Sequence, residues 1–226
     1  MVISTEHKCI FIHINKTGGR SISTSLFQRV KSHLTVRELF ELGYNSKIHP
    51  NERLQIAQYD PETILIKNNW ENYFKFCFVR NPWDRKLSDY FFNIKKNRTD
   101  IPNTSFTQYI KENHKNTDLW DLPGLEWIEY KDGNIDPSIF IGRFENLQED
   151  FNIVCDNINL PRRTLPVLNK TEHLPYWKYY TEETKALVEE KYKKDNELKY
   201  KNGKNQKESS RNRKLQKNGI WEDINI

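Results

Sequence analysis

Residues 15–21 read Asn-Lys-Thr-Gly-Gly-Arg-Ser and follow an apolar run that ends at Ile14. The pattern is typical of a buried strand that enters a short glycine loop and then a helix. The first N–H groups of a helix have no intrahelical acceptor, and the helix dipole adds partial positive charge at that end. The segment therefore predicts an anion site of the kind that holds a phosphate. The residues expected to contact the anion are Lys16, Thr17, Gly18, Gly19, Arg20 and Ser21.

The order of these residues separates the loop from an ordinary ATP or GTP loop. A Walker A sequence has a glycine, four residues, and then Gly-Lys followed by Ser or Thr. Here Lys16 comes before both glycines, and no glycine precedes it in the chain. The alternative interpretation is a plain strand-to-helix turn whose glycines only satisfy the backbone geometry, and this alternative stays open.

A second segment, residues 80–85, reads Arg-Asn-Pro-Trp-Asp-Arg and follows another apolar run. Asn81 is a favourable N-cap and Pro82 suits the first turn of a helix. Arg80 is then expected at the carboxyl end of a strand, and Ser88 about two turns into the helix. Ligands of open α/β sheets bind at such strand ends. The alternative is that Arg80 only pairs with Asp84 or Asp89 and that Ser88 only packs.

The elements that must position these residues alternate along the chain. Apolar runs predict strands at 8–14, 63–66, 74–79, 127–130 and 138–141. Helical spacing predicts helices at 21–32, 82–96, around 106–110, 147–158 and 181–192, and Thr35 with Glu38 forms a capping box for a helix to residue 42. Strands that alternate with helices predict a three-layer α/β/α domain with a central parallel sheet and a P-loop-like strand–loop–helix.

The two segments together resemble the sulfotransferases, in particular the membrane-type and carbohydrate sulfotransferases and their bacterial relatives. Residues 16–21 resemble their 5′-phosphosulfate loop, and Arg80 with Ser88 resembles their 3′-phosphate motif. Residues 141–147 are similar to a third block, and residues 168–171 stand where relatives carry a loop that closes over the nucleotide. The resemblance covers residues 8–195. Relatives usually have Pro at the position of Asn15, and Ser or Thr at that of Arg20.

The resemblance implies 3′-phosphoadenosine 5′-phosphosulfate (PAPS) as the sulfuryl donor, a hydroxyl acceptor, most readily a saccharide, and no metal. It implies Lys16 as a catalytic cation and Lys170 and Thr171 as further donor-binding residues. Relatives carry their catalytic histidine in a setting similar to that of His33, which is therefore the expected general base. His33 as a surface cap of the preceding helix, His49, and a carboxylate such as Glu52 or Glu126 are the alternatives.

Bulk properties set further expectations. A chain of 226 residues with 36% apolar residues can form one sizeable core, so we expect a domain over residues 1–198 and a basic, flexible tail over 199–226. Ten basic and five acidic residues in 193–226 account for the net charge of +5. We expect this charge to be solvated, with no nucleic-acid partner.

Cys9, Cys77 and Cys155 are odd in number and lie in apolar patterns, which indicates reduced core residues. No apolar stretch approaches the length of a membrane span, and the first eight residues lack a signal-peptide pattern. A cytoplasmic enzyme is therefore expected, and the oligomeric state stays open.

Two other functions fit the same residues. One is a carbohydrate- or nucleotide-binding module that has lost transfer activity through Asn15 and Arg20. The other is a nucleotide or sugar kinase with an atypical loop, which would need magnesium ligands that neither segment supplies beyond Asp84.

Overall fold

The computed structural model describes residues 1–27, 35–40, 61–96, 104–115, 121–168, 170 and 172–196. Its centre is a four-stranded sheet in the order β1-β2-β3-β4. The strands are β1 (Val2–Ser4), β2 (Cys9–Ile12), β3 (Phe74–Val79) and β4 (Ile139–Arg143). The three pairings differ in direction: β2 runs parallel to β3 and β3 to β4, whereas β1 is antiparallel to β2. The predicted α/β class is confirmed, and the predicted parallel sheet is corrected to a mostly parallel one with an antiparallel edge strand, β1.

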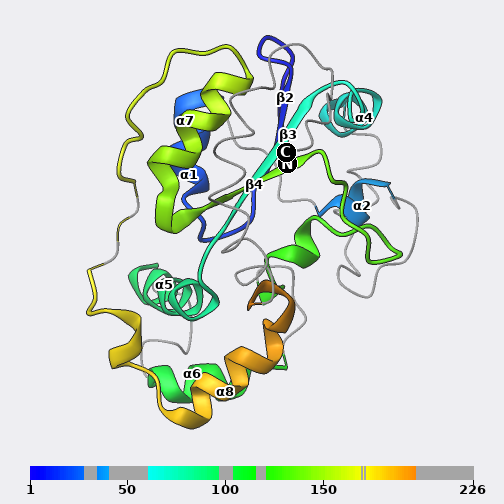
Figure 1. Ribbon diagram of the computed structural model, residues 1–226. Helices are drawn as coiled ribbons and strands as arrows, with labels where there is room; N and C mark the ends of the chain where they lie inside the picture. Colours follow the sequence, from blue (N-terminus) through cyan, green and yellow to red (C-terminus); the bar gives the residue numbers. More distant parts are fainter. Residues whose placement is uncertain are drawn as a thin grey trace, which may run out of the picture.

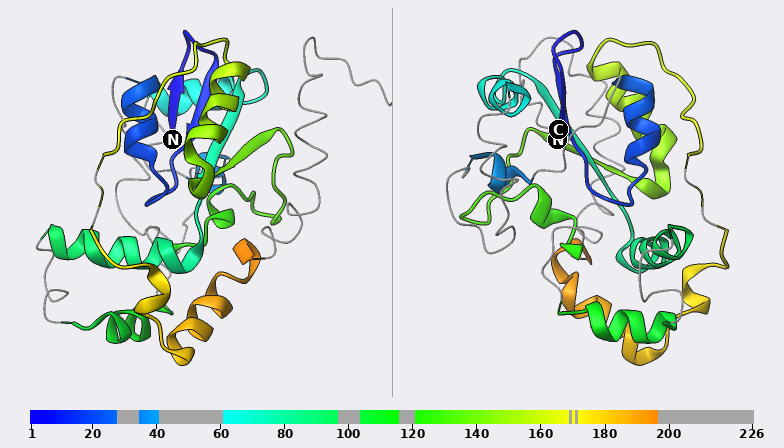
Figure 2. Two further views of the ribbon diagram at one scale, coloured as in Figure 1. Left: turned by 60° about the vertical axis from the view of Figure 1, so that its left-hand side comes forward. Right: turned by 180° about the vertical axis from the view of Figure 1, so that it is seen from behind.

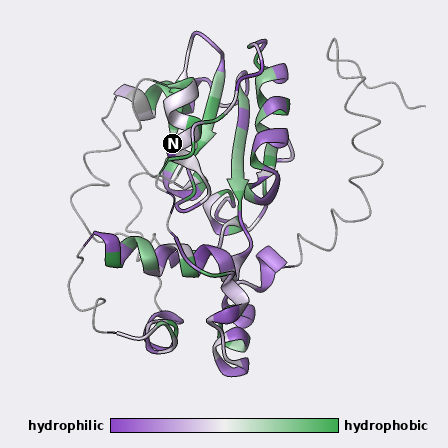
Figure 3. Cartoon of the chain, turned by 90° about the vertical axis from the view of Figure 1, so that its left-hand side faces the viewer, coloured by the Kyte–Doolittle hydropathy of each residue, from purple (hydrophilic) through white to green (hydrophobic). Residues whose placement is uncertain are grey.

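Alternation along the strands explains why both faces of the sheet are covered. Cys9 and Phe11 pack into the core on one face, and Ile10 and Ile12 pack into the core on the other. A strand that is apolar on both faces needs helices on both faces. Helices α1 (Gly19–Leu26) and α7 (Leu147–Asn157) lie on one side, and α2 (Val36–Phe40) and α4 (Pro61–Asn68) lie on the other (Figure 1). The strands are accordingly coloured mostly as hydrophobic in Figure 3.

Three more helices gather beyond the carboxyl ends of the strands (Figure 2). They are α5 (Pro82–Lys95), α6 (Phe106–Asn113) and α8 (Glu182–Lys191). A separate apolar cluster joins them, with Leu87, Tyr109 and Val188 at its centre. Short 3-10 turns η3 (Leu125–Trp127), η4 (Phe144–Asn146) and η5 (Tyr176–Lys178) connect the longer elements.

Helix-start signals in the sequence are confirmed. The Asn81 side chain accepts hydrogen bonds from the N–H groups of Trp83 and Asp84, with Pro82 in the first turn. Thr35 and Glu38 bond reciprocally through their side chains and backbone N–H groups, which is the predicted capping box. Thr181 caps α8 in the same way. These motifs act over three residues, so local sequence is sufficient to predict them.

Two predicted strands are wrong, one predicted helix has a different end, and one strand was missed. Residues 63–66 lie in helix α4 because Pro61 starts a helix that buries Thr63 and Ile66 one turn apart. Trp127 is the last residue of turn η3, and of residues 127–130 only Glu129 makes a β-bridge, to Ile135. The helix predicted at 21–32 is present as α1 but ends at Leu26, since Phe27 is extended and stacks on Phe11. The missed strand is β1, whose three residues are too few for an alternation signal.

The remaining predictions fall outside the described residues. These are His33, His49, Glu52, Thr171, and the tail at 199–226 together with the domain boundary before it. They stay predictions.

Candidate functional site

The two segments with the motif residues meet at one edge of the sheet. Because β2 and β3 are parallel, with Ile12 opposite Cys77, the loop after β2 and the residue after β3 emerge at the same edge. The Arg80 guanidinium nitrogen Nη1 donates a hydrogen bond to the carbonyl oxygen of Lys16 at 3.1 Å. The two motifs are therefore in direct contact.

Close packing explains the two glycines of the loop. Gly18 has φ +81° and is the N-cap of α1, a left-handed conformation that glycine adopts readily. A Cβ on Gly19 would lie 1.8 Å from His13 Nε2, so a side chain there would collide with the imidazole. The glycines let the backbone turn directly from β2 into α1, so the first-turn N–H groups of the helix lie at the sheet edge.

Lys16 lies in the loop with φ +61°, a conformation that non-glycine residues rarely adopt. Its ammonium nitrogen sits 3.7 Å from the centre of the Phe92 ring on α5. Thr17 is buried, and its hydroxyl donates to the carbonyl of Ile14 at 2.8 Å. The Lys16 ammonium is thus held between the loop and α5, and the Thr17 hydroxyl makes its donated hydrogen bond within the loop.

The first turn of α1 carries the other two loop side chains. Arg20 is exposed. Ser21 is buried, and its hydroxyl accepts a hydrogen bond from the N–H of Leu168 at 3.4 Å. The segment after α7 therefore contacts the start of α1, close to exposed Lys170.

Arg80 is held from three sides. Its side chain pairs with Asp84 at 2.8 Å and lies 4.0 Å from the ring centre of Phe144, in addition to its bond to Lys16. Burial lowers the pKa of the Arg80 guanidinium, while the Asp84 carboxylate opposes that shift. The alternative that Arg80 pairs with Asp84 is thus correct, and the pairing coexists with its contact to the loop.

The block after β4 also reaches this edge. Phe144 lies against Arg80, and the Glu145 carboxylate accepts a hydrogen bond from the N–H of Asn81 at 2.6 Å. Ser88 is buried one turn before Phe92 on α5. Three segments that are far apart in the sequence therefore surround one place: residues 15–21, 80–92 and 143–145.

The described residues of 165–177 contact both α1 and α5. Leu168 contacts Ser21 at one end, and His173 stacks on Phe91 of α5 at the other, with ring centres 5.2 Å apart. Most of the large apolar side chains that are exposed in the described part of the chain belong to this segment: Val167, Leu168, Leu174 and Trp177. The segment therefore lies beside the anion loop and presents apolar side chains to solvent.

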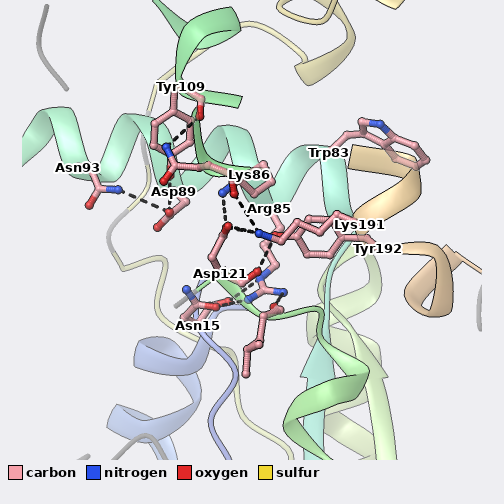
Figure 4. Close-up of polar contacts among 12 residues, drawn as sticks. Asn15, Trp83, Arg85, Lys86, Asp89, Asn93, Tyr109, Asp121, Lys191 and Tyr192 are labelled. Carbon is pink, nitrogen blue, oxygen red and sulfur yellow. Dashed lines mark hydrogen bonds and ion pairs between the residues drawn. The ribbon is translucent and has the colours of Figure 1, made fainter. Parts of the chain in front are cut away.

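A buried charged network supports the site and was missed from the sequence (Figure 4). The Asp121 carboxylate accepts hydrogen bonds from both Lys86 and Lys191, and Arg85 donates to Asn15 and to the Leu122 carbonyl. Lys86 follows Arg85 directly, and an Arg-Lys pair is usually solvated. The one signal in the sequence that could have indicated burial of Arg85 and Lys86 is the pair of apolar neighbours in the predicted helix, Trp83 and Leu87.

Among the described residues, Glu126 is the one proton acceptor named from the sequence. His13, at the end of the first apolar run, is buried and stacks on Phe11. Glu126 lies in η3, where burial and the neighbouring Glu129 raise the pKa of its carboxyl group. His33 and His49 lie outside the described residues.

Within the described ranges, no cluster of three or more His, Cys, Asp or Glu side chains is arranged to hold a metal ion. None of the helices in these ranges combines the length and the apolar character that crossing a bilayer requires.

Comparison with known proteins identifies the family. The sequence matches the model of the sulfotransferase family over residues 1–217. It is also similar to an uncharacterized protein of Archaeoglobus fulgidus, with 33% identity over 98 residues, which are 42% of this chain and 75% of that protein. No solved structure matches it significantly. Since the family match spans nearly all of the 226 residues, the chain belongs to the sulfotransferase family.

Proposed function

We propose that this chain transfers a sulfuryl group from PAPS to a hydroxyl group of an acceptor, most readily a carbohydrate. Family membership indicates sulfuryl transfer. The observation that carries the proposal is the direct contact between Arg80 and the backbone of Lys16. It brings a fixed guanidinium and a loop at a helix N-terminus to one sheet edge, as a donor with phosphate groups on both the 3′ and the 5′ oxygen of its ribose requires.

The loop would bind the 5′-phosphosulfate in a P-loop-like manner. Gly18 and Gly19 give the backbone access, and Lys16 supplies a cation to offset charge that develops on the sulfuryl oxygens. Thr17 would act through its backbone, because its hydroxyl already donates to Ile14. Arg20, Ser21, Lys170 and Thr171 would add further contacts to the donor.

Arg80 and Ser88 would hold the 3′-phosphate. A guanidinium matches a phosphate with two parallel hydrogen bonds, and Asp84 together with the Phe144 ring restricts its orientation. Asn81 and Pro82 begin α5 in a defined direction, which sets where Ser88 lies relative to Arg80. The short strand-to-helix segment thereby fixes both residues.

The donor-binding half of the proposal is tested by calorimetry with adenosine 3′,5′-bisphosphate. Wild-type protein is expected to bind it, and Arg80→Ala to lose most of that affinity. Arg162→Ala is the matched control, because Arg162 also pairs with an aspartate but lies exposed after α7. Binding of ATP with magnesium in place of the bisphosphate would favour the kinase alternative, and equal binding by wild type and Arg80→Ala would refute the assigned phosphate site.

The transfer half is tested by measuring donor desulfation with a panel of hydroxylated sugars. Lys16→Ala is expected to abolish turnover and to keep the fold, while exposed Lys193→Ala stays active. A wild type that binds the bisphosphate but sulfates no acceptor would support the binding-module alternative. Wild-type turnover in Lys16→Ala would remove that lysine from the mechanism.

His33 is proposed as the base that accepts the proton of the acceptor hydroxyl. A histidine base must be neutral, so activity should fall below a pH of about 6.5 if the residue is unperturbed. His33→Ala should lower turnover by roughly two to four orders of magnitude, leave donor binding intact, and flatten the acidic limb of the pH profile. An unchanged acidic limb in an active variant would transfer the role to His49 or to a carboxylate.

A further inference from the structure

The loop between β2 and α1 is held by side chains on each of three consecutive carbonyl groups. The hydroxyl of Thr17 donates to the Ile14 carbonyl at 2.8 Å, Arg85 Nε to the Asn15 carbonyl at 3.2 Å, and Arg80 Nη1 to the Lys16 carbonyl at 3.1 Å. In a trans peptide the C=O and the following N–H point in opposite directions. Fixing these carbonyls therefore also fixes the directions of the next three N–H groups.

Arg85 makes the most extensive of these contacts. Besides the Asn15 carbonyl, its guanidinium bonds the Asn15 side-chain oxygen through Nη2 and the Leu122 carbonyl through Nη1 at 2.8 Å (Figure 4). Arg85 and Asn15 are only 3% and 5% exposed. Because a guanidinium presents its donors in a rigid plane, these bonds fix both the backbone and the side chain of Asn15 relative to α5.

The loop needs such support because its backbone is strained. Lys16, next to Asn15, has a positive φ, which costs a non-glycine residue free energy and persists only where the surroundings impose it. Arg85 holds the residue before this strained position, and Arg80 holds the strained residue itself. Both arginines belong to the same strand-to-helix segment, so they hold the loop in a fixed position relative to that segment.

We infer that Arg85, acting through Asn15, is a positioning residue of the donor-binding loop, since it fixes the backbone N–H groups that would receive the donor's anionic end. The inference rests on the proposed function for the identity of the ligand, but its geometric content concerns the loop alone. Arg85 is not expected to contact the donor, because its guanidinium is buried between Asn15 and Leu122.

Two variants separate positioning from general stability. Arg85→Lys keeps the buried charge and loses the planar fork, and Asn15→Leu keeps the volume and loses the side-chain acceptor. Each is expected to weaken binding of adenosine 3′,5′-bisphosphate about tenfold, the usual effect of losing a hydrogen bond to a charged group. The double variant should lose less affinity than the sum of the two single losses, because both remove the bond between Arg85 Nη2 and the Asn15 side-chain oxygen.

Arg37→Lys is the matched control. Arg37 also donates to a backbone carbonyl, that of Tyr130 at 3.4 Å, but on helix α2 away from the loop. It should leave the dissociation constant of the bisphosphate unchanged. Variants of Arg85 and Asn15 that melt earlier yet bind the bisphosphate with wild-type affinity would overturn the inference and leave a purely structural role.

Hydrogen exchange of the unliganded protein gives a readout that does not depend on the ligand. Amides of residues 15–20 should exchange faster in Arg85→Lys and Asn15→Leu than in wild type and in Arg37→Lys. Unchanged exchange in this loop would overturn the inference even if the bisphosphate binds. Failure of wild type to bind the bisphosphate, with faster loop exchange in the two variants, would instead overturn the proposed function alone.

Discussion

Replacing Asp121 should destabilise the protein more than any single exposed charge can. Its two carboxylate oxygens accept hydrogen bonds from Lys86 and Lys191, and the Tyr192 hydroxyl donates to the same group at 3.3 Å. Asp121 and Lys86 are 6% and 4% exposed. Two ammonium groups therefore share one buried counter-charge. Without that charge, little water would reach them in its place.

Asp121→Asn keeps the shape of the side chain and removes that charge. Breaking a buried ion pair by removing one partner costs about 3–5 kcal/mol, because the remaining charge stays buried without compensation. For a domain of this size, each kcal/mol lowers the melting temperature by about 2–4 °C. The expected loss is therefore about 6–20 °C.

Calorimetry or circular dichroism at neutral pH measures this loss. Asp156→Asn is the control, since Asp156 pairs with Arg162 at an exposed position, where a pair contributes about 0–1 kcal/mol. Adding Lys86→Met to Asp121→Asn should recover part of the stability, because one uncompensated charge is then absent. A melting temperature for Asp121→Asn equal to that of the control would refute the reasoning.

Three further predictions address other parts of the fold. Gly19→Ala should lower stability by about 1–3 kcal/mol in urea unfolding, because its Cβ would collide with His13; wild-type stability would mean that the imidazole moves freely. Burial raises the pKa of the Glu126 carboxyl group in the folded protein, so the wild type loses stability as pH rises above the pKa of that group in the unfolded chain. Glu126→Gln should therefore raise the melting temperature at pH 7 more than at pH 4. An equal change at both pH values would count against this explanation. Burial raises the pKa of the Cys9 thiol to about 12 and also raises that of Cys77, so a thiol reagent at pH 8 should label them only after unfolding; rapid labelling of the native protein would contradict their burial.

Local sequence was sufficient for the elements whose signals span a few residues. The strand Phe74–Val79 was predicted to the residue and α5 to within one residue. The apolar run marks the strand, and the Asn81-Pro82 pair marks the start of the helix that follows it. The sequence placed the glycine loop and Arg80 each at the end of an apolar run, but that they meet depends on β2 and β3 being neighbours in the sheet. What it predicted was therefore the position of the motif residues along the chain.

Tertiary structure decided the points that depend on partners distant in sequence. Residues 63–66 have strand-like composition, yet Ile66 packs in the core beside Trp70 as part of a helix. Arg85 reaches Asn15 across 70 positions, and Asp121 reaches Lys191 across the same separation. No local pattern encodes such pairs, because the cost of burying a charge depends on which opposite charge the fold brings to it.

The same physics explains what the sequence showed about the loop itself and what it did not. The residue types at 15–21 indicate an anion site, because glycines, hydroxyls and a lysine before a helix have that chemistry in any fold. Phe92, whose ring packs against the Lys16 ammonium, lies on α5. Arg80 and Arg85, which donate to two neighbouring carbonyls of the loop, lie just before α5 and in its first turn. The sequence by itself determined the chemistry of the site, and only the packing of α5 against the loop decided how that chemistry is oriented.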